Sequence, residues 1–275
     1  MFFTRFFNKQ IDFLLLTCHI AAIHKGSFIT KGDHIRMNLL LLTEEDRCGN
    51  VFEVTERRAE HIRTVLRASC GDTIKCGMLN GKIGNGILLE LERNRAKIQC
   101  DSFDLEPPPK NNIIPIISLP RPQSFKKTLH FIASAGIAKA FFVGSAKVEK
   151  SYWKSSAMQP ENILEEIKLG LEQGVDTIEP ELIFYPELHT FFEKEESFLQ
   201  SCQTKIIAHP EPGAPLCPHA LSSETPVLLA IGPEGGYTTR EVEVFRNHGF
   251  NCVSLGRNIL RVEFALSVLC GKLCP

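Results

Sequence analysis

Beyond residue 112 the chain alternates short, nearly continuous apolar runs with longer amphipathic segments. Such apolar runs are typical of strands buried in a parallel sheet, and apolar positions three or four apart are typical of helices. Their alternation predicts an α/β domain over 113–275, with helices on both faces of a parallel sheet. The expected strands are 113–119, 139–144, 180–185, 204–209, 227–232 and 250–256, and the expected helices are 124–135, 160–173, 188–200, one that begins near residue 240 and one within 257–269.

Between residues 37 and 104 the pattern changes to short strands separated by turns. Asn80-Gly81 and Gly84-Asn85-Gly86 are both signals for hairpin turns. This layout predicts a small β-barrel domain. Residues 105–112 are proline-rich and polar, which is typical of a stiff linker between domains. Within the barrel the expected strands are 39–42, 50–54, 72–79, 86–91 and 96–100, with a short helix at 56–66.

Two strand–glycine–helix units stand close together near the C-terminus. The first runs from strand 227–232 into Gly232-Pro233-Glu234-Gly235-Gly236, where glycine lets the backbone approach a ligand closely. Thr238 or Thr239 can cap the following helix. The second unit ends its strand at Gly256 and continues into an apolar helix. Turns at the carboxyl ends of parallel strands are where open α/β sheets bind ligands, so the pair predicts a ligand site.

These two units, GPEGGYTTREVEVF and GFNCVSLGRNILRVEFAL, resemble the C-terminal signature of the RsmE family. The segment IIAHPEP, 206–212, resembles the other cofactor loop of that family, and HIRTVLRASCGDTIKCGML, from His61, resembles its opening domain. RsmE proteins are SPOUT-class enzymes that methylate N3 of a uridine in 16S ribosomal RNA of the small subunit. The resemblance implies a SPOUT α/β-knot fold, with a C-terminal trefoil knot and a PUA-like barrel at 37–104. It also implies a cytoplasmic homodimer.

The resemblance further implies that S-adenosylmethionine lies between the IIAH loop, the GPEGG turn and the LGRNIL loop. The glycines would allow close approach, and the leucines and isoleucines would line the adenine, although plain core packing is their other interpretation. Glu234 would bind the ribose or cap the next helix, and no metal is expected. The residues expected to bind the cofactor are His209, Gly232, Glu234, Gly235, Gly236, Leu255, Gly256, Ile259 and Leu260.

Catalysis at a uridine N3 requires loss of a proton, so a cation beside the uracil oxygens would stabilise the developing anion. Arg261 follows the LGRNIL loop and is the expected cation. A structural partnership with a backbone carbonyl or with Glu263 is equally open. Glu263 could accept the N3 proton or orient Arg261, and the second role is favoured for a carboxylate so close to an arginine.

Contacts with RNA must come from local patches, because a net charge of −1 gives no basic field over the whole protein. The helix at 56–66 is rich in basic residues, and helical spacing would place Arg63 and Arg67 on one face. A solvated helix face is the ordinary interpretation of such a run. The loop at 147–154 mixes basic and aromatic residues, which suits stacking on an unpaired base or a dimer contact. The residues expected to bind RNA are Arg57, His61, Arg63, Arg67, Lys150, Trp153 and Lys154.

Residues 1–36 are an N-terminal extension of doubtful status. The apolar run at 11–23 is too short to span a bilayer and lacks a convincing cleavage site, so no membrane association is expected. We expect translation to start at Met37, because MNLLLLTEED resembles the first strand of the family. The ten cysteines contain no CxxC pair, which favours reduced thiols over a zinc site.

The sequence departs from the RsmE pattern at Asp176, where an arginine is expected, and at 134–136, where the family has E-L-G. These departures indicate a divergent subgroup. Two alternatives remain open. One is a SPOUT enzyme acting on another RNA or atom, such as a tRNA ribose, and the other is a non-catalytic RNA-binding factor in ribosome assembly. A Rossmann-type dehydrogenase is disfavoured, because no G-x-G-x-x-G follows the first strand.

Overall fold

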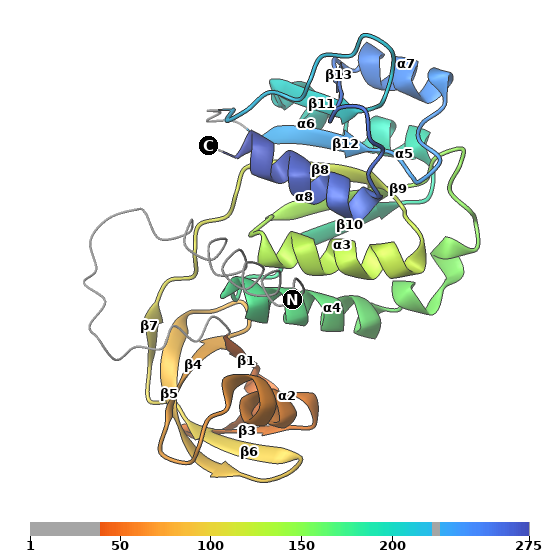
Figure 1. Ribbon diagram of the computed structural model, residues 1–275. Helices are drawn as coiled ribbons and strands as arrows, with labels where there is room; N and C mark the ends of the chain where they lie inside the picture. The colour runs from red at the N-terminus through yellow and green to blue at the C-terminus, as the bar shows by residue number, and fades with distance from the viewer. Residues whose placement is uncertain (1–38, 222–225, 275) are drawn as a thin grey trace, which may run out of the picture. The chain divides into compact units, whose positions relative to one another are not determined.

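The computed structural model describes residues 39–221 and 226–274, all within one compact unit that spans 37–275 (Figure 1). The extension expected at 1–36 and the start expected at Met37 lie outside the described residues. The described chain forms two sheets: an apolar cluster is buried in the first, and one is buried on each face of the second. Among the described helices, none combines the length and the apolar character needed to cross a membrane.

The N-terminal sheet is seven-stranded and mostly antiparallel, with the order β1-β4-β5-β6-β3-β2 and β7 paired to β5. Alternate residues of its strands point inward, so that Phe52, Leu88 and Ile98 are fully buried in one core. This sheet confirms the strands expected in this region and adds two short ones. The strands are β1 (Leu40–Leu42), β2 (Arg47–Cys48), β3 (Val51–Thr55), β4 (Thr73–Met78), β5 (Ile83–Leu91), β6 (Arg95–Gln99) and β7 (Phe103–Leu105).

The turn expected at Gly84-Asn85-Gly86 is wrong, because β5 runs straight through these residues. The actual hairpin turn is at Asn80-Gly81, where Asn80 takes a left-handed φ of 57°. A Cβ on Gly84 would collide with the carbonyl of Ser102, and one on Gly86 would collide with Ile98. These two glycines therefore permit close approach of neighbouring chain and do not reverse its direction.

The helix expected at 56–66 is replaced by two short pieces. The first is α2 (Arg57–His61), and the second is a wider π-helical turn over Ile62–Leu66. Arg67 then ends the segment in the left-handed region, with φ 49°. The spacing that would align Arg63 with Arg67 does not apply to a π turn, so the prediction that they share one helix face is wrong.

The C-terminal sheet is six-stranded and entirely parallel, with the order β10-β9-β8-β12-β11-β13. It confirms the expected strand–helix alternation, except that the helix expected at 188–200 breaks at Glu195. The strands are β8 (Ile113–Ser118), β9 (Lys139–Val143), β10 (Glu181–Tyr185), β11 (Thr204–Ala208), β12 (Val227–Ile231) and β13 (Asn251–Val253). The helices are α3 (Pro122–Ser134), α4 (Pro160–Gly174), α5 (Leu188–Lys194), α6 (Glu196–Ser201), α7 (Thr239–Asn247) and α8 (Val262–Leu273).

Helices cover both faces of this sheet, which explains why its central strand β12 is apolar and buried along its whole length. On β9, Phe142 belongs to the cluster formed with α3, α4 and α8, while its neighbour Phe141 belongs to the cluster formed with α5, α6 and α7. Figure 1 shows α3, α4 and α8 together on one side of the sheet. Successive residues of a strand point to opposite faces, so each must find its own apolar layer.

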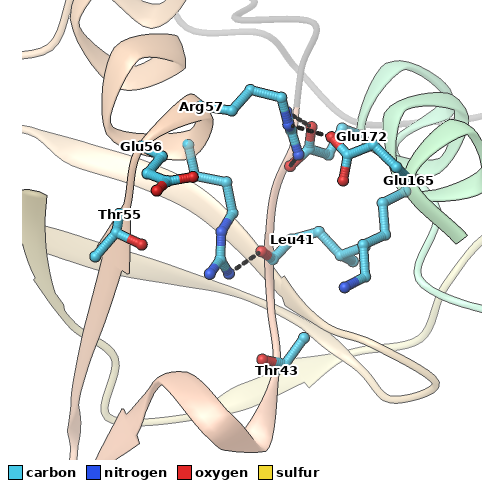
Figure 2. Close-up of a pocket in the computed structure, with 9 residues that line it drawn as sticks. Leu41, Thr43, Thr55, Glu56, Arg57, Glu165 and Glu172 are labelled. Atoms are coloured by element: carbon cyan, nitrogen blue, oxygen red, sulfur yellow. Dashed lines mark hydrogen bonds and ion pairs between the residues drawn. The ribbon is translucent and has the colours of Figure 1, made fainter. Parts of the chain in front are cut away.

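The N-terminal sheet is tied to the end of α4 by charged and polar contacts. The Leu39 N–H donates to the Glu172 carbonyl at 3.0 Å, and the Arg57 guanidinium lies 2.7 Å from a Glu165 carboxylate oxygen and 2.8 Å from one of Glu172. Figure 2 shows Arg57 directed at these two carboxylates. The cavity drawn there, about 320 Å³, has basic and acidic residues in balance on its wall.

Asp176, just after α4, joins the linker to this region. Its buried carboxylate accepts from Lys110 Nζ at 2.5 Å and from the Thr177 N–H at 2.7 Å. Lys110 also donates to the Ile178 carbonyl at 2.7 Å, which fastens the proline-rich segment 106–112 to the chain after α4. The departure from the RsmE pattern at Asp176 therefore has a structural role.

Candidate cofactor and RNA site

Three neighbouring parallel strands, β11, β12 and β13, end at the same edge of the C-terminal sheet. The loops that follow them enclose a cavity of about 280 Å³, formed by 208–210, 231–237, 253–256 and 258–260 together with parts of α8 and Lys147. Every residue expected to bind the cofactor lines this one cavity: His209, Gly232, Glu234, Gly235, Gly236, Leu255, Gly256, Ile259 and Leu260.

The shape of the loops depends on two glycines and a helix cap. Gly236 and Gly256 have φ of 67° and 110°, where side chains are strained. Thr238 is the cap of α7: its hydroxyl accepts from the Glu241 N–H at 3.3 Å, and Glu241 accepts from the Thr238 N–H at 2.8 Å. Glu241 also accepts from the Ala146 N–H at 2.7 Å, so this reciprocal cap fixes the glycine turn to the loop after β9.

Sequence reasoning missed two side chains that shape the cavity. Lys147 Nζ donates to the Gly235 carbonyl at 2.7 Å, yet it comes from a loop far away in the sequence, and no local signal indicated the contact. Tyr237 is buried and donates from its hydroxyl to the Ile231 carbonyl at 3.0 Å. Burial raises the pKa of the Tyr237 phenol, which therefore stays protonated and keeps this bond. The position of Tyr237 directly after Gly235 and Gly236 was the one sequence feature that could have indicated its role.

His209 brings a polar atom to the cavity wall. Its Nδ1 is buried and has no hydrogen-bond partner among the described residues. Burial lowers the pKa of the imidazole, so the neutral form is favoured at neutral pH. A buried ring nitrogen without a protein partner is suited to bind a polar group of a ligand.

The two residues expected to act in catalysis lie apart from this cavity. Arg261 is the exposed N-cap residue of α8 and lines a second cavity of about 520 Å³. Glu263, in the first turn of α8, is 4% exposed and lines neither of these two cavities. Its nearest described cation is Lys127, with Nζ 3.8 Å from Oε1. Both roles considered for Glu263 remain predictions.

The residues expected to bind RNA differ in their availability. Arg57 is occupied by Glu165 and Glu172, and His61 has a buried Nε2 with its pKa lowered by burial. Arg63 forms an ion pair with Glu60 and donates to the Arg93 carbonyl at 3.1 Å, but it stays exposed. Trp153 is half-buried against the core of the C-terminal sheet. The remaining residues of this set are exposed: Arg67, Lys150 and Lys154.

The fold and site together define an α/β protein with a ligand cavity at the carboxyl ends of parallel strands and a small β domain before it. The RNA methyltransferase domain family matches residues 106–273, and the chain belongs to this family. Ribosomal RNA small subunit methyltransferase E of Treponema pallidum is 29% identical over 244 residues, which cover 86% of this chain and 90% of that protein. Ribosomal RNA small subunit methyltransferase E 1 of Borreliella burgdorferi is 25% identical over 233 residues, covering 83% and 94%.

A solved structure has the same fold. The crystal structure of a ribosomal RNA small subunit methyltransferase E from Neisseria gonorrhoeae, bound to S-adenosyl methionine, aligns with a TM-score of 0.62. It is 23% identical, and the alignment covers 86% of this chain and 96% of that one. The alignment thus includes both sheets.

Proposed function

We propose that this protein transfers a methyl group from S-adenosylmethionine to N3 of a uridine in small-subunit ribosomal RNA, in the cytoplasm. The observation that carries the proposal is the convergence of three loops on one cavity, with Arg261 at the start of the helix that follows. The names of the Treponema and Borreliella relatives support the choice of substrate.

The cavity suits S-adenosylmethionine. Ile231, Leu255 and Leu260 offer an apolar surface for the adenine, and the glycine turns leave main chain open to polar groups. The Nδ1 of His209 adds a buried polar atom, and the Glu234 carboxylate can accept from the ribose hydroxyls. When bound, the cofactor supplies an electrophilic methyl group.

Arg261 stabilises the uracil in this proposal. Its guanidinium donates to a uracil carbonyl oxygen, which becomes negative when N3 loses its proton. Glu263 acts indirectly, as a buried carboxylate in the first turn of α8, where negative charge stabilises the helix that carries Arg261.

We propose that the C-terminal part forms the trefoil knot of the SPOUT class and that the N-terminal sheet is PUA-like and binds RNA. Support for the knot comes from the segment at 214–221. The Cys217 N–H donates to the Ser254 carbonyl at 2.8 Å, and the Ala220 N–H donates to the Lys272 carbonyl at 2.7 Å. The chain before β12 thus lies against chain that follows β13. For RNA contact, the exposed residues carry the proposal: Arg63, Arg67, Lys150 and Lys154.

A deletion strain tests the proposed function. Small-subunit ribosomal RNA from cells lacking the gene should lack one N3-methyluridine, measured by mass spectrometry of its nucleosides, and the purified enzyme should restore it. An unchanged N3-methyluridine content would contradict the proposal. A lost methyl on a tRNA ribose would favour the other SPOUT alternative, and assembly defects with unchanged methylation would favour the non-catalytic one.

The outer face of α8 supports the proposed homodimer. Phe264 is 53% and Val268 41% exposed, one turn apart, and a Cβ on Gly271 would meet open space. A second copy of this face would bury these side chains beside the cofactor cavity. Phe264→Glu should therefore give a monomer in light scattering, whereas Ile87→Glu, 45% exposed on β5, should leave the dimer intact. A Phe264→Glu protein that is still dimeric would place the interface elsewhere.

Gly256→Val should weaken S-adenosylmethionine binding by more than about tenfold in calorimetry. A β-branched residue at φ 110° costs about 1–3 kcal/mol, and its side chain would reshape the cavity wall. Gly213→Val is the matched control, because Gly213 also has a positive φ, 83°, but lies outside the cavity. Equal affinities for the two variants would exclude the Gly256 turn from the cofactor site.

A further inference from the structure

The second cavity lies beside the first. Both include Glu234, so this residue forms a common wall between them. Its position is fixed from the other side, since the Arg121 N–H donates to Glu234 Oε1 at 3.0 Å. The start of α3 and the glycine turn are thereby joined at the boundary. The residues lining the second cavity are Arg121, Pro122, Gln123, Ser124, Tyr152, Glu234 and Arg261.

Most side chains in the wall of this cavity carry hydrogen-bond donors, and Glu234 is its one carboxylate. Arg121 and Arg261 are both exposed, and no ion pair within 39–221 and 226–274 involves either guanidinium. Burial, followed by Glu149, raises the pKa of the Tyr152 phenol, and Arg121 partly offsets this rise, so the hydroxyl remains protonated. The N-terminus of α3, the positive end of its helix dipole, also lines this cavity. The cavity therefore favours a ligand that carries acceptor atoms and gains negative charge.

We propose that this cavity binds the target uracil and that Arg121 is a substrate-binding residue, which together with Arg261 holds the two carbonyl oxygens of the N3-deprotonated base. The inference rests on the proposed function and adds its base-recognition residue. A uracil presents two acceptors on either side of N3, and loss of the N3 proton spreads negative charge onto both. Cytosine carries an amino donor in place of one of them and would place donor against donor, which such a site rejects strongly.

The chemistry balances without another reactant. The N3–H bond breaks and the proton passes to solvent, with the anion held by the two guanidiniums. The N3 electron pair then forms a bond to the methyl carbon. The bond from that carbon to sulfur breaks, and its electrons remain on sulfur, which becomes a neutral thioether. Arg121 lowers the free energy needed to remove the N3 proton, so it raises the fraction of reactive anion at neutral pH.

Arg121→Gln tests the inference in single-turnover methylation of small subunits from the deletion strain, with radioactive S-adenosylmethionine. At neutral pH the rate constant should fall by about 10- to 100-fold. The pH at which the rate levels off should rise by about one unit, because the anion is less stabilised. Arg121→Lys should recover part of both changes. The affinity of Arg121→Gln for S-adenosylmethionine, measured by calorimetry, should stay unchanged. Arg240→Gln is the control variant: Arg240 is an exposed arginine outside the cavity, so its replacement should leave the methylation rate unchanged.

The possible failures are distinguishable. Wild-type enzyme that forms no N3-methyluridine would overturn the proposed function and this inference together. Wild-type enzyme that forms it, beside an Arg121→Gln variant with the same rate and pH profile, would overturn the inference alone. Loss of cofactor binding in Arg121→Gln would also overturn it, because the side chain would then support the glycine turn and not the base.

Discussion

Replacing Arg261 by alanine should lower kcat for methylation of small subunits by about 10²- to 10³-fold, the range seen when a donor to a developing oxyanion is removed. The Kd for S-adenosylmethionine should change little, because Arg261 does not line the cofactor cavity. Isothermal calorimetry and radioactive methyl transfer measure the two quantities separately. The effect is large because the guanidinium acts on the charged form of the base and not on the neutral one.

Arg257→Ala provides the matched control. Arg257 is exposed on the same loop and lines neither of the two cavities, so its replacement should leave kcat within about threefold of wild type if a change of charge alone has no effect. An Arg261→Ala enzyme with a kcat close to wild type would remove Arg261 from the mechanism and leave it as a structural cap of α8.

Glu172→Gln should lower the free energy of unfolding by about 2–3 kcal/mol. The Glu172 carboxylate is 4% exposed and accepts from Arg57 Nη1 at 2.8 Å, so its loss leaves a partly buried guanidinium short of one partner. Breaking a fully buried pair costs about 3–5 kcal/mol. The lower figure applies here because the Arg57 side chain is 35% exposed and retains Glu165. Urea unfolding monitored by Trp153 fluorescence measures the change.

Glu165→Gln is the control for that measurement. It removes the other carboxylate from the same arginine, but Glu165 is 48% exposed, so the expected loss is under about 1 kcal/mol. Equal losses for the two variants would mean that burial of Glu172 contributes nothing to the connection between the N-terminal sheet and α4.

The sequence predicts much of the cofactor cavity because local patterns locate the strand ends. Once β11, β12 and β13 are recognised as parallel strands, their following loops must meet at one edge. The pattern placed the turns at Gly232 and Gly256 together, and the RsmE resemblance added His209, although the three are far apart in the chain. The alternation of strands and helices was equally readable, since a sheet covered on both faces needs apolar residues on every side.

Other features depend on contacts that no local pattern encodes. Arg121 and Lys147 come from loops after β8 and β9, and only the strand order brings them to the cavities. The glycines of β5 carry a turn signal, but the neighbouring chain decides their role by its close approach. The sequence likewise does not reveal that the Glu165 and Glu172 carboxylates pair with Arg57.

The bond between Lys110 and Asp176 constrains how relatives of this protein can diverge. Asp176 is 1% exposed, so an arginine at this position, as in the common RsmE pattern, would press a second cation against Lys110. The two positions should therefore change together. Chains that carry arginine at the position of Asp176 should have lost the lysine at the position of Lys110. An acidic residue at the position of Lys110 would pair with that arginine and keep the linker bound to the chain after α4.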